Sequence, residues 1–199
     1  MFHVKQPDGA IRTRLDAFRD LLLTWNARIN LIAPADVAQV EQRHIADSLQ
    51  LLPLLPEAGP MGDLGSGGGL PALVLAAAEP DREWHLVESD RRKCAFLIEA
   101  ARVMDLPAIR IHATRIEDAA LPPLSGLTAR ALAPLAKLLP HAARLLAPGG
   151  IAIFPKGRNA EAELTEAIRD WTMTIERHPS RTDPTAAILR LSEIRRAAP

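Results

Sequence analysis

A glycine-rich turn is the part of this sequence with the clearest chemical meaning. Residues 61–71 read Met-Gly-Asp-Leu-Gly-Ser-Gly-Gly-Gly-Leu-Pro, so that Asp63 precedes a run in which glycine fills four of the five positions 65–69. Glycine tolerates positive φ and has no side chain, so such a turn lets a ligand lie against the backbone. The apolar residues that follow predict a helix whose first N–H groups point back into the turn. In α/β proteins this arrangement is typical of a nucleotide-like cofactor site.

Two cofactors are compatible with the spacing of these glycines. Counted from Gly67, the run Gly67-x-Gly69-x-x-Ala72 fits the dinucleotide fingerprint, with Glu88 at a suitable distance for a ribose. Counted from Asp63, the pattern Asp-x-Gly-x-Gly-x-Gly resembles the first motif of the class I S-adenosylmethionine (SAM) methyltransferases. The turn alone therefore leaves both a dinucleotide and SAM open.

The elements that must position this turn follow from the apolar pattern. From residue 61 on, strands alternate with helices, which predicts a parallel sheet covered on both faces. The expected strands are 61–64, 84–88, 109–113, 127–131 and 151–154, and the expected helices are 70–78, 91–104, 135–146 and 160–170. Two later runs, 172–178 and 186–191, predict a terminal hairpin. An inserted antiparallel strand resembles the class I methyltransferase fold, whereas a dinucleotide-binding half would continue with parallel units.

The first part of the chain predicts helices only. Apolar residues at spacings of three and four indicate one helix face, formed by Leu15, Phe18, Leu22, Trp25 and Ile29. A second helical stretch begins near Asp36, where Asp36-x-x-Gln39 resembles a capping box, and ends at Pro53. We therefore expect a helical extension over residues 1–58 and a second domain over 59–199, with Trp25 in the core.

Candidate binding residues stand where the expected strands end, because ligands of such sheets bind at the carboxyl ends of strands. Glu88 ends its strand with a carboxylate that could accept both hydroxyls of a ribose. Asp63 could hold the ammonium of an amino-acid moiety. Glu117 follows the third strand, at the place where an adenine usually lies in such folds.

Composition limits the class of protein. The 199 residues include 24 Lys and Arg against 24 Asp and Glu, so the chain lacks the overall basicity common in nucleic-acid binders, although basic residues cluster locally. The single cysteine, Cys94, excludes an intramolecular disulfide and a Cys-rich metal site. No apolar stretch approaches the roughly 20 residues of a membrane span, and the first residues lack the apolar core of a signal peptide. We expect a cytoplasmic protein with no metal and no membrane contact.

Motifs spread over most of the chain carry a more specific resemblance. The most distinctive is Arg43-His44-Ile45-x-Asp47-Ser48-Leu49. The others are Trp25-Asn26-x-x-x-Asn30-Leu31, the glycine turn, Glu88-Ser89-x-x-x-Lys93-x-x-Phe96-Leu97, Arg115-x-Glu117, Arg130-Ala131 and Lys156-Gly157. Together they resemble the bacterial small-subunit ribosomal RNA guanine-N7 methyltransferases, the RsmG or glucose-inhibited division protein B family.

The resemblance implies a class I methyltransferase fold, Rossmann-like and mostly parallel, with a terminal antiparallel hairpin and an N-terminal helical extension. It implies SAM as cofactor and 16S ribosomal RNA as substrate, within a small-subunit particle or an assembly intermediate. The cofactor contacts that it implies are Gly65, Leu70, Ile116, Glu117 and Arg130, to which the strand-end argument adds Asp63, Gly67 and Glu88. The chain departs from the family pattern at three positions, with Glu88 for Asp, Ala72 for Gly and Ala129 for Ser.

Methylation of the implied acceptor atom, guanine N7, requires few catalytic groups from the protein. Guanine N7 has a free lone pair and no proton to lose, so we expect no general base, and Arg130 and Lys156 are candidates for positioning. The chain lacks the Asn/Asp-Pro-Pro-aromatic loop typical of exocyclic amine methylation, and we expect Cys94 to lie in a helix away from the strand ends, where it could not attack a pyrimidine ring. The expected RNA-facing residues are Arg91, Arg92, Lys93, Lys156 and Arg158.

Three alternatives stay open at this point. The chain could methylate another RNA or a small molecule, or it could be a nicotinamide-dependent oxidoreductase that uses Gly67-x-Gly69-x-x-Ala72. His44 and Asp47 lie one helical turn apart, so they could either contact RNA or hydrogen-bond within their own helical region.

Overall fold

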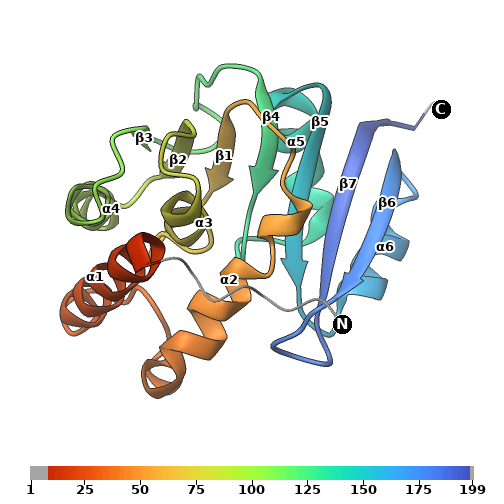
Figure 1. Ribbon diagram of the computed structural model, residues 1–199. Coiled ribbons are helices and arrows are strands. Elements are labelled where there is room, and N and C mark those ends of the chain that lie inside the picture. Colours follow the sequence, from red (N-terminus) through yellow and green to blue (C-terminus); the bar gives the residue numbers. More distant parts are fainter. Residues whose placement is uncertain (1–8, 198–199) are drawn as a thin grey trace.

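The computed structural model describes residues 9–197 and contains one seven-stranded sheet with the strand order β3-β2-β1-β4-β5-β7-β6 (Figure 1). The strands are β1 Met61–Leu64, β2 Trp84–Glu88, β3 Ile109–Ala113, β4 Leu124–Thr128, β5 Leu146–Lys156, β6 Trp171–Pro179 and β7 Ala187–Arg196. Strands β1 to β5 are parallel, and β7 pairs antiparallel with both β5 and β6. The mostly parallel sheet with a terminal antiparallel hairpin is therefore confirmed.

Helices cover both faces of this sheet. Residues of α1 Gly9–Asn26, α3 Ala72–Ala78 and α4 Arg91–Val103 share one apolar core, and residues of α5 Leu135–Leu145 and α6 Ala160–Ala167 share a second core. Neighbouring residues of one strand belong to different cores, as Leu86 and Val87 of β2 do. This alternation is what a strand buried on both faces requires.

The helical extension packs directly on the sheet domain. Leu15, Phe18 and Leu22 of α1 are buried, and the ring of Phe18 lies 6.4 Å from that of Phe96 in α4. Trp25 meets the same Phe96 ring edge-on at 5.9 Å, so its expected place in the core is confirmed. Residues 9–58 thus share a core with α3 and α4, while residues 1–8 of the expected extension lie outside the described ones. The domain boundary at residue 58 stays a prediction.

The second helical stretch is built differently from the expectation. It consists of the 3₁₀ helix η1 Pro34–Gln39, the π-helical turn η2 Glu41–Ala46, the short α2 Asp47–Leu49 and the 3₁₀ turn η3 Leu52–Leu54. The expected capping box is wrong, because Ala33 occupies the N-cap of η1 and no side chain caps it. Asp36 instead forms an ion pair with Arg43, at 2.9 Å.

Two further boundaries that bear on the site differ from the sequence prediction, besides a longer fifth strand and a shorter last helix. The first helix ends at Asn26 rather than Ile29, because Asn26 Oδ1 accepts hydrogen bonds from the backbone N–H groups of Leu31 and Ile32, at 2.9 and 3.0 Å, and so fixes a turn. The fourth strand spans 124–128 rather than 127–131. It ends at Thr128, which pairs with Asp63, and the backbone then bends through Ala131 at a φ of 52°. Arg130 consequently lies in a loop.

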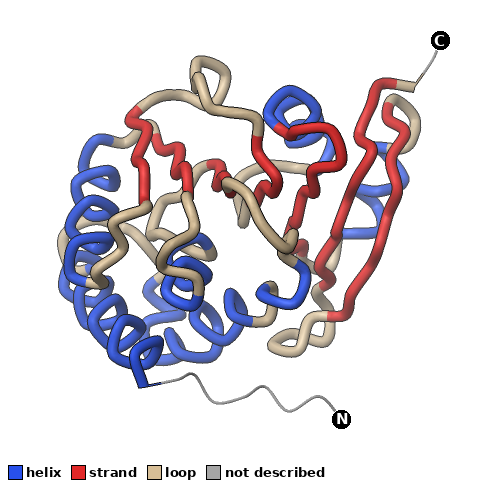
Figure 2. Tube along the Cα trace, turned by 45° about the horizontal axis from the view of Figure 1, so that its top comes forward, coloured by secondary structure: helices blue, strands red, loops and turns tan. Residues whose placement is uncertain are grey.

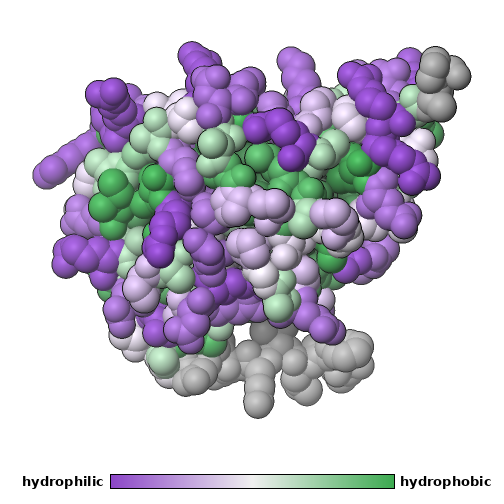
Figure 3. All heavy atoms as spheres, turned by 90° about the horizontal axis from the view of Figure 1, so that it is seen from above, coloured by the Kyte–Doolittle hydropathy of each residue, from purple (hydrophilic) through white to green (hydrophobic). Residues whose placement is uncertain are grey.

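The two ends of the sheet differ in what surrounds them. At the end where the parallel strands terminate, the turn between β6 and β7 lies beside the helical segment 41–54, to which Arg181 N–H is joined by a 2.8 Å hydrogen bond with Gln50 Oε1 (Figure 2). The opposite end, seen from above in Figure 3, shows hydrophobic residues scattered among hydrophilic ones. Among residues 9–197, no helix combines the length and apolar character needed to cross a membrane.

The shared core predicts that the extension and the sheet unfold together. Phe18→Ala should lower the free energy of unfolding by about 3–5 kcal/mol, because it removes a fully buried ring from between α1 and α4. Urea unfolding followed by far-ultraviolet circular dichroism should show one transition at a lower midpoint. The control Val37→Ala, at a side chain that is 39% exposed, should change little. A second transition that keeps the wild-type midpoint would show that the extension folds on its own.

Candidate functional site

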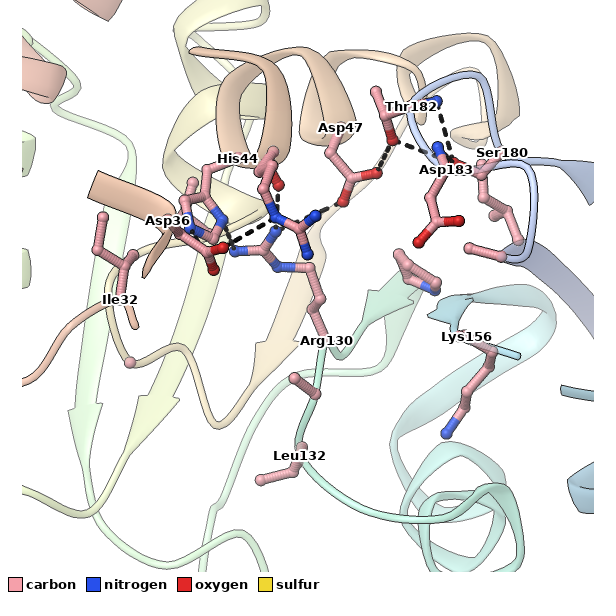
Figure 4. A pocket seen from close by; sticks show the side chains of 18 of the residues that line it. Ile32, Asp36, His44, Asp47, Arg130, Leu132, Lys156, Ser180, Thr182 and Asp183 are labelled. Atoms are coloured by element: carbon pink, nitrogen blue, oxygen red, sulfur yellow. Dashed lines mark hydrogen bonds and ion pairs between the residues drawn. The ribbon is translucent and has the colours of Figure 1, made fainter. Parts of the chain in front are cut away.

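A cleft of about 740 Å³ opens at the carboxyl ends of the parallel strands. Its walls come from the segment 31–50, the glycine turn after β1, the loop 130–134 after β4, the end of β5, Glu163 of α6 and the turn that leads into β7 (Figure 4). Six stretches of the chain therefore meet at one edge of the sheet, which is where a parallel sheet binds its ligands.

The glycine turn keeps its shape through both its own backbone and Glu88. Gly65, Gly67 and Gly69 all have positive φ, between 51° and 76°. A Cβ on Gly69 would lie 2.5 Å from Leu73 Cδ1, so a side chain there would clash with α3. The buried Glu88 carboxylate accepts a hydrogen bond from Gly67 N–H, at 2.9 Å, and thereby ties the turn to the end of β2.

Asp90 is a residue of this edge that the sequence prediction missed. Its N–H donates to the second oxygen of Glu88 at 2.8 Å, and its own carboxylate caps α4 by accepting from the N–H groups of Arg92 and Lys93, at 2.8 and 3.4 Å. An Asp immediately before a predicted helix is an N-cap signal, and it could have identified this residue. The cap sets the start of α4 against Glu88.

Asp63 lies beneath the glycine turn rather than in the wall of the cleft. It is 1% exposed, and its Oδ1 accepts a hydrogen bond from Thr128 Oγ at 2.6 Å. Its other oxygen, Oδ2, is buried and has no hydrogen-bond partner among residues 9–197. Burial raises the pKa of this carboxyl from 3.8 to about 7, although the Thr128 hydroxyl opposes that shift. The site thus contains a buried acidic group that forms no ion pair within residues 9–197.

Arg130 is held by the helical extension. Its guanidinium donates to His44 Nδ1 at 3.0 Å and to Arg43 O at 3.4 Å, and it forms an ion pair with Asp47 at 3.4 Å (Figure 4). Burial, helped by the positive charge of Arg130, lowers the pKa of His44 to about 4, so the imidazole is neutral at pH 7. An arginine only donates, so Nδ1 accepts and the proton sits on Nε2, which faces Asp36 at 3.4 Å. His44 and Asp47 therefore serve to place Arg130.

A second group of hydrogen bonds joins the β6–β7 turn to Asp47 and Gln50 of the helical extension. Asp47 Oδ1 accepts a hydrogen bond from Thr182 Oγ at 2.5 Å, and Gln50 donates to the same oxygen at 2.7 Å. Gln50 also reaches Ser180 Oγ, at 3.3 Å. One carboxylate thus joins Arg130 on one side to the turn on the other side.

Lys156 lines the cleft, and its ammonium group forms an ion pair within the protein. It is 9% exposed, donates to Ala133 O at 2.8 Å and forms an ion pair with Glu163 at 2.9 Å. Glu163 also accepts from Leu135 N–H, at 2.7 Å. Lys156 therefore ties the end of β5 to the loop after β4 and to α6, and its contact with RNA stays a prediction.

The other expected RNA-facing residues lie outside the cleft lining. Arg91 and Arg92 are exposed at the start of α4, Lys93 is half-buried there, and Arg158 is exposed after β5. These positions leave the basic side chains in contact with solvent around the carboxyl ends of the strands.

The residues expected to meet an adenine follow β3 and also lie outside the cleft lining. Arg144 donates to Ile116 O at 2.6 Å and to Ala119 O at 3.0 Å, and so holds the loop that contains Glu117. Cys94 lies in a helix, α4, as expected, but not away from the strand ends, because its thiol donates to Glu88 O, at 3.2 Å, at the end of β2. The thiol is buried and burial raises its pKa, so it is a packing group rather than a nucleophile.

Comparison with known proteins agrees with this geometry. The family model described as rRNA small subunit methyltransferase G (GidB) matches residues 11–184. Proteins named ribosomal RNA small subunit methyltransferase G are 51% identical in Granulibacter bethesdensis, over 98% of this chain and 100% of that protein, and 56% identical in Acidiphilium cryptum, over 92% and 86%.

Solved structures with low sequence identity share the fold. The N-methyltransferase NodS from Bradyrhizobium japonicum, in complex with S-adenosyl-L-homocysteine, has a TM-score of 0.59 at 15% identity, over 90% of this chain and 98% of that chain. TYW2 from M. jannaschii, in complex with AdoMet, has a TM-score of 0.59 at 12% identity, over 86% and 80%. The fold is that of the class I SAM-dependent methyltransferases.

The raised pKa of Asp63 predicts a specific pH dependence of stability. An acid whose pKa rises from 3.8 to about 7 on folding contributes stability that is complete below pH 3.8 and is lost as the pH rises through 7. The free energy of unfolding of the wild type relative to Asp63→Asn should therefore fall between roughly pH 4 and 7 and change little above that range, as measured by urea titrations. Asp81→Asn, at an exposed site, is the control. An offset that does not change with pH would mean that Asp63 titrates at its ordinary value.

Proposed function

The chain belongs to the rRNA small subunit methyltransferase G family, and from this premise we propose how its residues transfer a methyl group from SAM to N7 of a guanine in 16S ribosomal RNA. The proposal rests on one observation: the glycine turn and a set of polar side chains line the same cleft. The glycine turn, which is of the cofactor-binding type, forms one wall, and polar side chains of the extension and of the loop after β4 line other parts of the cleft. A cofactor and an acceptor base can therefore lie side by side.

The residues around the turn fit SAM. The turn presents bare backbone, and each oxygen of Glu88 uses one lone pair on a backbone N–H, which leaves further lone pairs for the ribose hydroxyls. The unpartnered Oδ2 of Asp63 suits the positive charge of the amino-acid part. We propose the same cofactor contacts as the family implies, which are Gly65, Leu70, Ile116, Glu117 and Arg130, together with Gly67. When bound, SAM supplies an electrophilic methyl group on a sulfonium sulfur.

A dinucleotide does not explain the rest of the fold. The sheet ends in an antiparallel hairpin, with β7 inserted between β5 and β6. A dinucleotide-binding half would add parallel units at this edge. The family and the sheet topology together favour the SAM assignment over the nicotinamide alternative.

The polar side chains of the cleft position the reactants and do not need to move a proton. Methyl transfer is an in-line displacement, so holding donor and acceptor at close approach is the main contribution of the protein. His44 and Asp47 hold Arg130 over the cleft, and Lys156 holds the loop that carries it. Arg130 retains N–H groups beyond those used by the extension, and these can orient a ligand.

The substrate is ribosomal RNA, and we propose that the guanine is presented unpaired in a small-subunit particle or an assembly intermediate. A guanine in an A-form helix has its N7 in the deep and narrow major groove, which protein side chains cannot read. A base turned out of its stack can enter a cleft of this size. The exposed cations Arg91, Arg92 and Arg158, with Lys93, would neutralise flanking phosphates. We propose a cytoplasmic location, which agrees with a ribosomal substrate.

The transfer step should be almost independent of pH. With saturating RNA in single-turnover assays with labelled SAM, we expect less than about a threefold change in rate between roughly pH 6.5 and 8.5, since N7 has no proton to lose. The RNA would come from a strain that lacks the gene, both as naked 16S RNA and as small-subunit particles. Reductive cleavage of the RNA at 7-methylguanosine identifies the product. A tenfold rise in rate per pH unit would reassign the acceptor to an amine or a hydroxyl.

Glu88→Ala should weaken SAM binding by about 1.5–3 kcal/mol, the range for hydrogen bonds to a charged group. The loss should combine the ribose contact with a loosened glycine turn, because Gly67 N–H loses its partner. Calorimetry measures the affinity, and Glu57→Ala, at an exposed site, is the control. Unchanged SAM binding with a lowered unfolding midpoint would make Glu88 a purely structural residue.

A further inference from the structure

The carboxylates that line the cleft are not equivalent. Asp36, Asp47, Glu163 and Asp183 all contribute to its walls. The first three form ion pairs at N–O distances of 2.9, 3.4 and 2.9 Å, which join Asp36 to Arg43, Asp47 to Arg130 and Glu163 to Lys156. Asp183 has no ion pair within the described part of the chain. Among the carboxylates named here, Asp183 is therefore the one free to pair with a ligand.

The position of Asp183 is nevertheless well defined. It lies in the turn between β6 and β7, and its Oδ1 accepts hydrogen bonds from the N–H and the hydroxyl of Thr185, at 2.8 and 2.7 Å. Its own N–H donates to Ser180 Oγ at 3.2 Å. These bonds orient the carboxylate, and Oδ2 keeps no hydrogen bond to another residue between 9 and 197. Figure 4 shows the carboxylate turned away from the helical extension, toward the side of the cleft where Lys156 lies.

The Asp183 carboxylate is ionised at neutral pH. The hydrogen bonds from Thr185 lower the pKa of Asp183, and the positive charges of Arg43 and Arg158 act in the same direction. The turn is also anchored, because Thr182 and Arg181 bond to Asp47 and Gln50. A charged acceptor is thus presented on a fixed turn.

The N7 atom alone does not distinguish guanine from adenine. Adenine has an N7 with the same free lone pair, so the choice of guanine must depend on another edge of the base. On the six-membered ring, guanine presents the adjacent donors N1–H and N2–H, whereas adenine presents a lone pair at N1 and only a C–H at position 2. An ionised carboxylate accepts from both guanine donors and repels the adenine lone pair.

We propose that Asp183 determines the specificity for guanine by accepting hydrogen bonds from N1–H and N2–H of the acceptor base. This rests on the proposed function. N7 lies on the other side of the purine from these donors, so a base held by Asp183 directs N7 away from the β6–β7 turn and toward the glycine turn, which follows β1 and is separated from β7 by β4 and β5. A carboxylate that loses water without gaining donors is costly, so a base that lacks the donors is rejected.

A substrate with one amino group removed tests the contact directly. The RNA would be 16S RNA assembled by splinted ligation, naked or reconstituted into particles, with inosine in place of the guanosine that the wild type methylates. Inosine keeps N7, O6 and N1–H but lacks the N2 amino group. For the wild type, kcat/KM should fall by about 10- to 100-fold on inosine, as expected for one hydrogen bond to a charged group.

The variants isolate the role of Asp183. In Asp183→Ala the activity on guanosine should fall, and the further loss on inosine should shrink to less than about threefold, since the acceptor for the amino group is gone. Asp183→Asn keeps one uncharged acceptor oxygen, so its loss on inosine should lie between that of Asp183→Ala and that of the wild type. Thr185→Ala removes one bond that orients the turn but keeps the carboxylate, so it should retain the discrimination against inosine. The Kd for SAM should be unchanged in all three variants.

Three results would overturn the assignment. The wild type could methylate inosine as well as guanosine, the Asp183 variants could penalise inosine as strongly as the wild type, or Asp183→Asn could weaken SAM binding, which would give the carboxylate to the cofactor. Failure of the proposed function is seen separately, because the wild type would then place no methyl group on N7 of the guanosine RNA.

Discussion

A half-buried cation, Arg130, ties the helical extension to the sheet domain at the edge of the cleft. Arg130 comes from the loop after β4, yet its hydrogen-bond partners lie more than 80 residues away in the helical extension. Removing a guanidinium from water is costly unless acceptors surround it. Asp47, His44 and the carbonyl of Arg43 supply these acceptors. Their contacts with Arg130 in turn favour the neutral form of His44 and orient Asp47. His44 stays neutral so that it can accept, and Asp47 keeps its second oxygen for the β6–β7 turn.

The loop that carries Arg130 is shaped by the glycine turn opposite it. Ala131 has a φ of 52°, which is unfavourable for a residue with a side chain. The bend sends Leu132 toward Gly65, where a Cβ would come within 2.5 Å of Leu132 Cδ1. The glycine turn and the loop therefore fit together only while position 65 has no side chain. Lys156 adds the remaining restraint through Ala133 O, so three elements define one compartment.

The sequence was sufficient for features that depend on local pattern. The apolar alternation placed the sheet, its terminal hairpin and most of the helices, and the glycines with Glu88 marked the cofactor edge. Contacts between segments that are distant in the sequence could not be predicted from it. Asp36 looked like a helix cap because the sequence does not show that Arg43 and His44 fold back onto it. Asp183 was missed as a binding residue because Asp and Pro are ordinary turn formers, and its unpaired carboxylate is visible only against its neighbours.

The electrostatics of the cleft favour an acceptor that gives up no proton. A general base needs a free lone pair and a pKa near the working pH. His44 fails on both counts, since its pKa is lowered to about 4 and Arg130 occupies Nδ1. Lys156 is ion-paired with Glu163, and Asp63, with a pKa of about 7, lies beneath the turn and outside the cleft lining. The polar groups of the cleft are therefore arranged to hold two reactants in place, which is all that a ring nitrogen with a free lone pair requires.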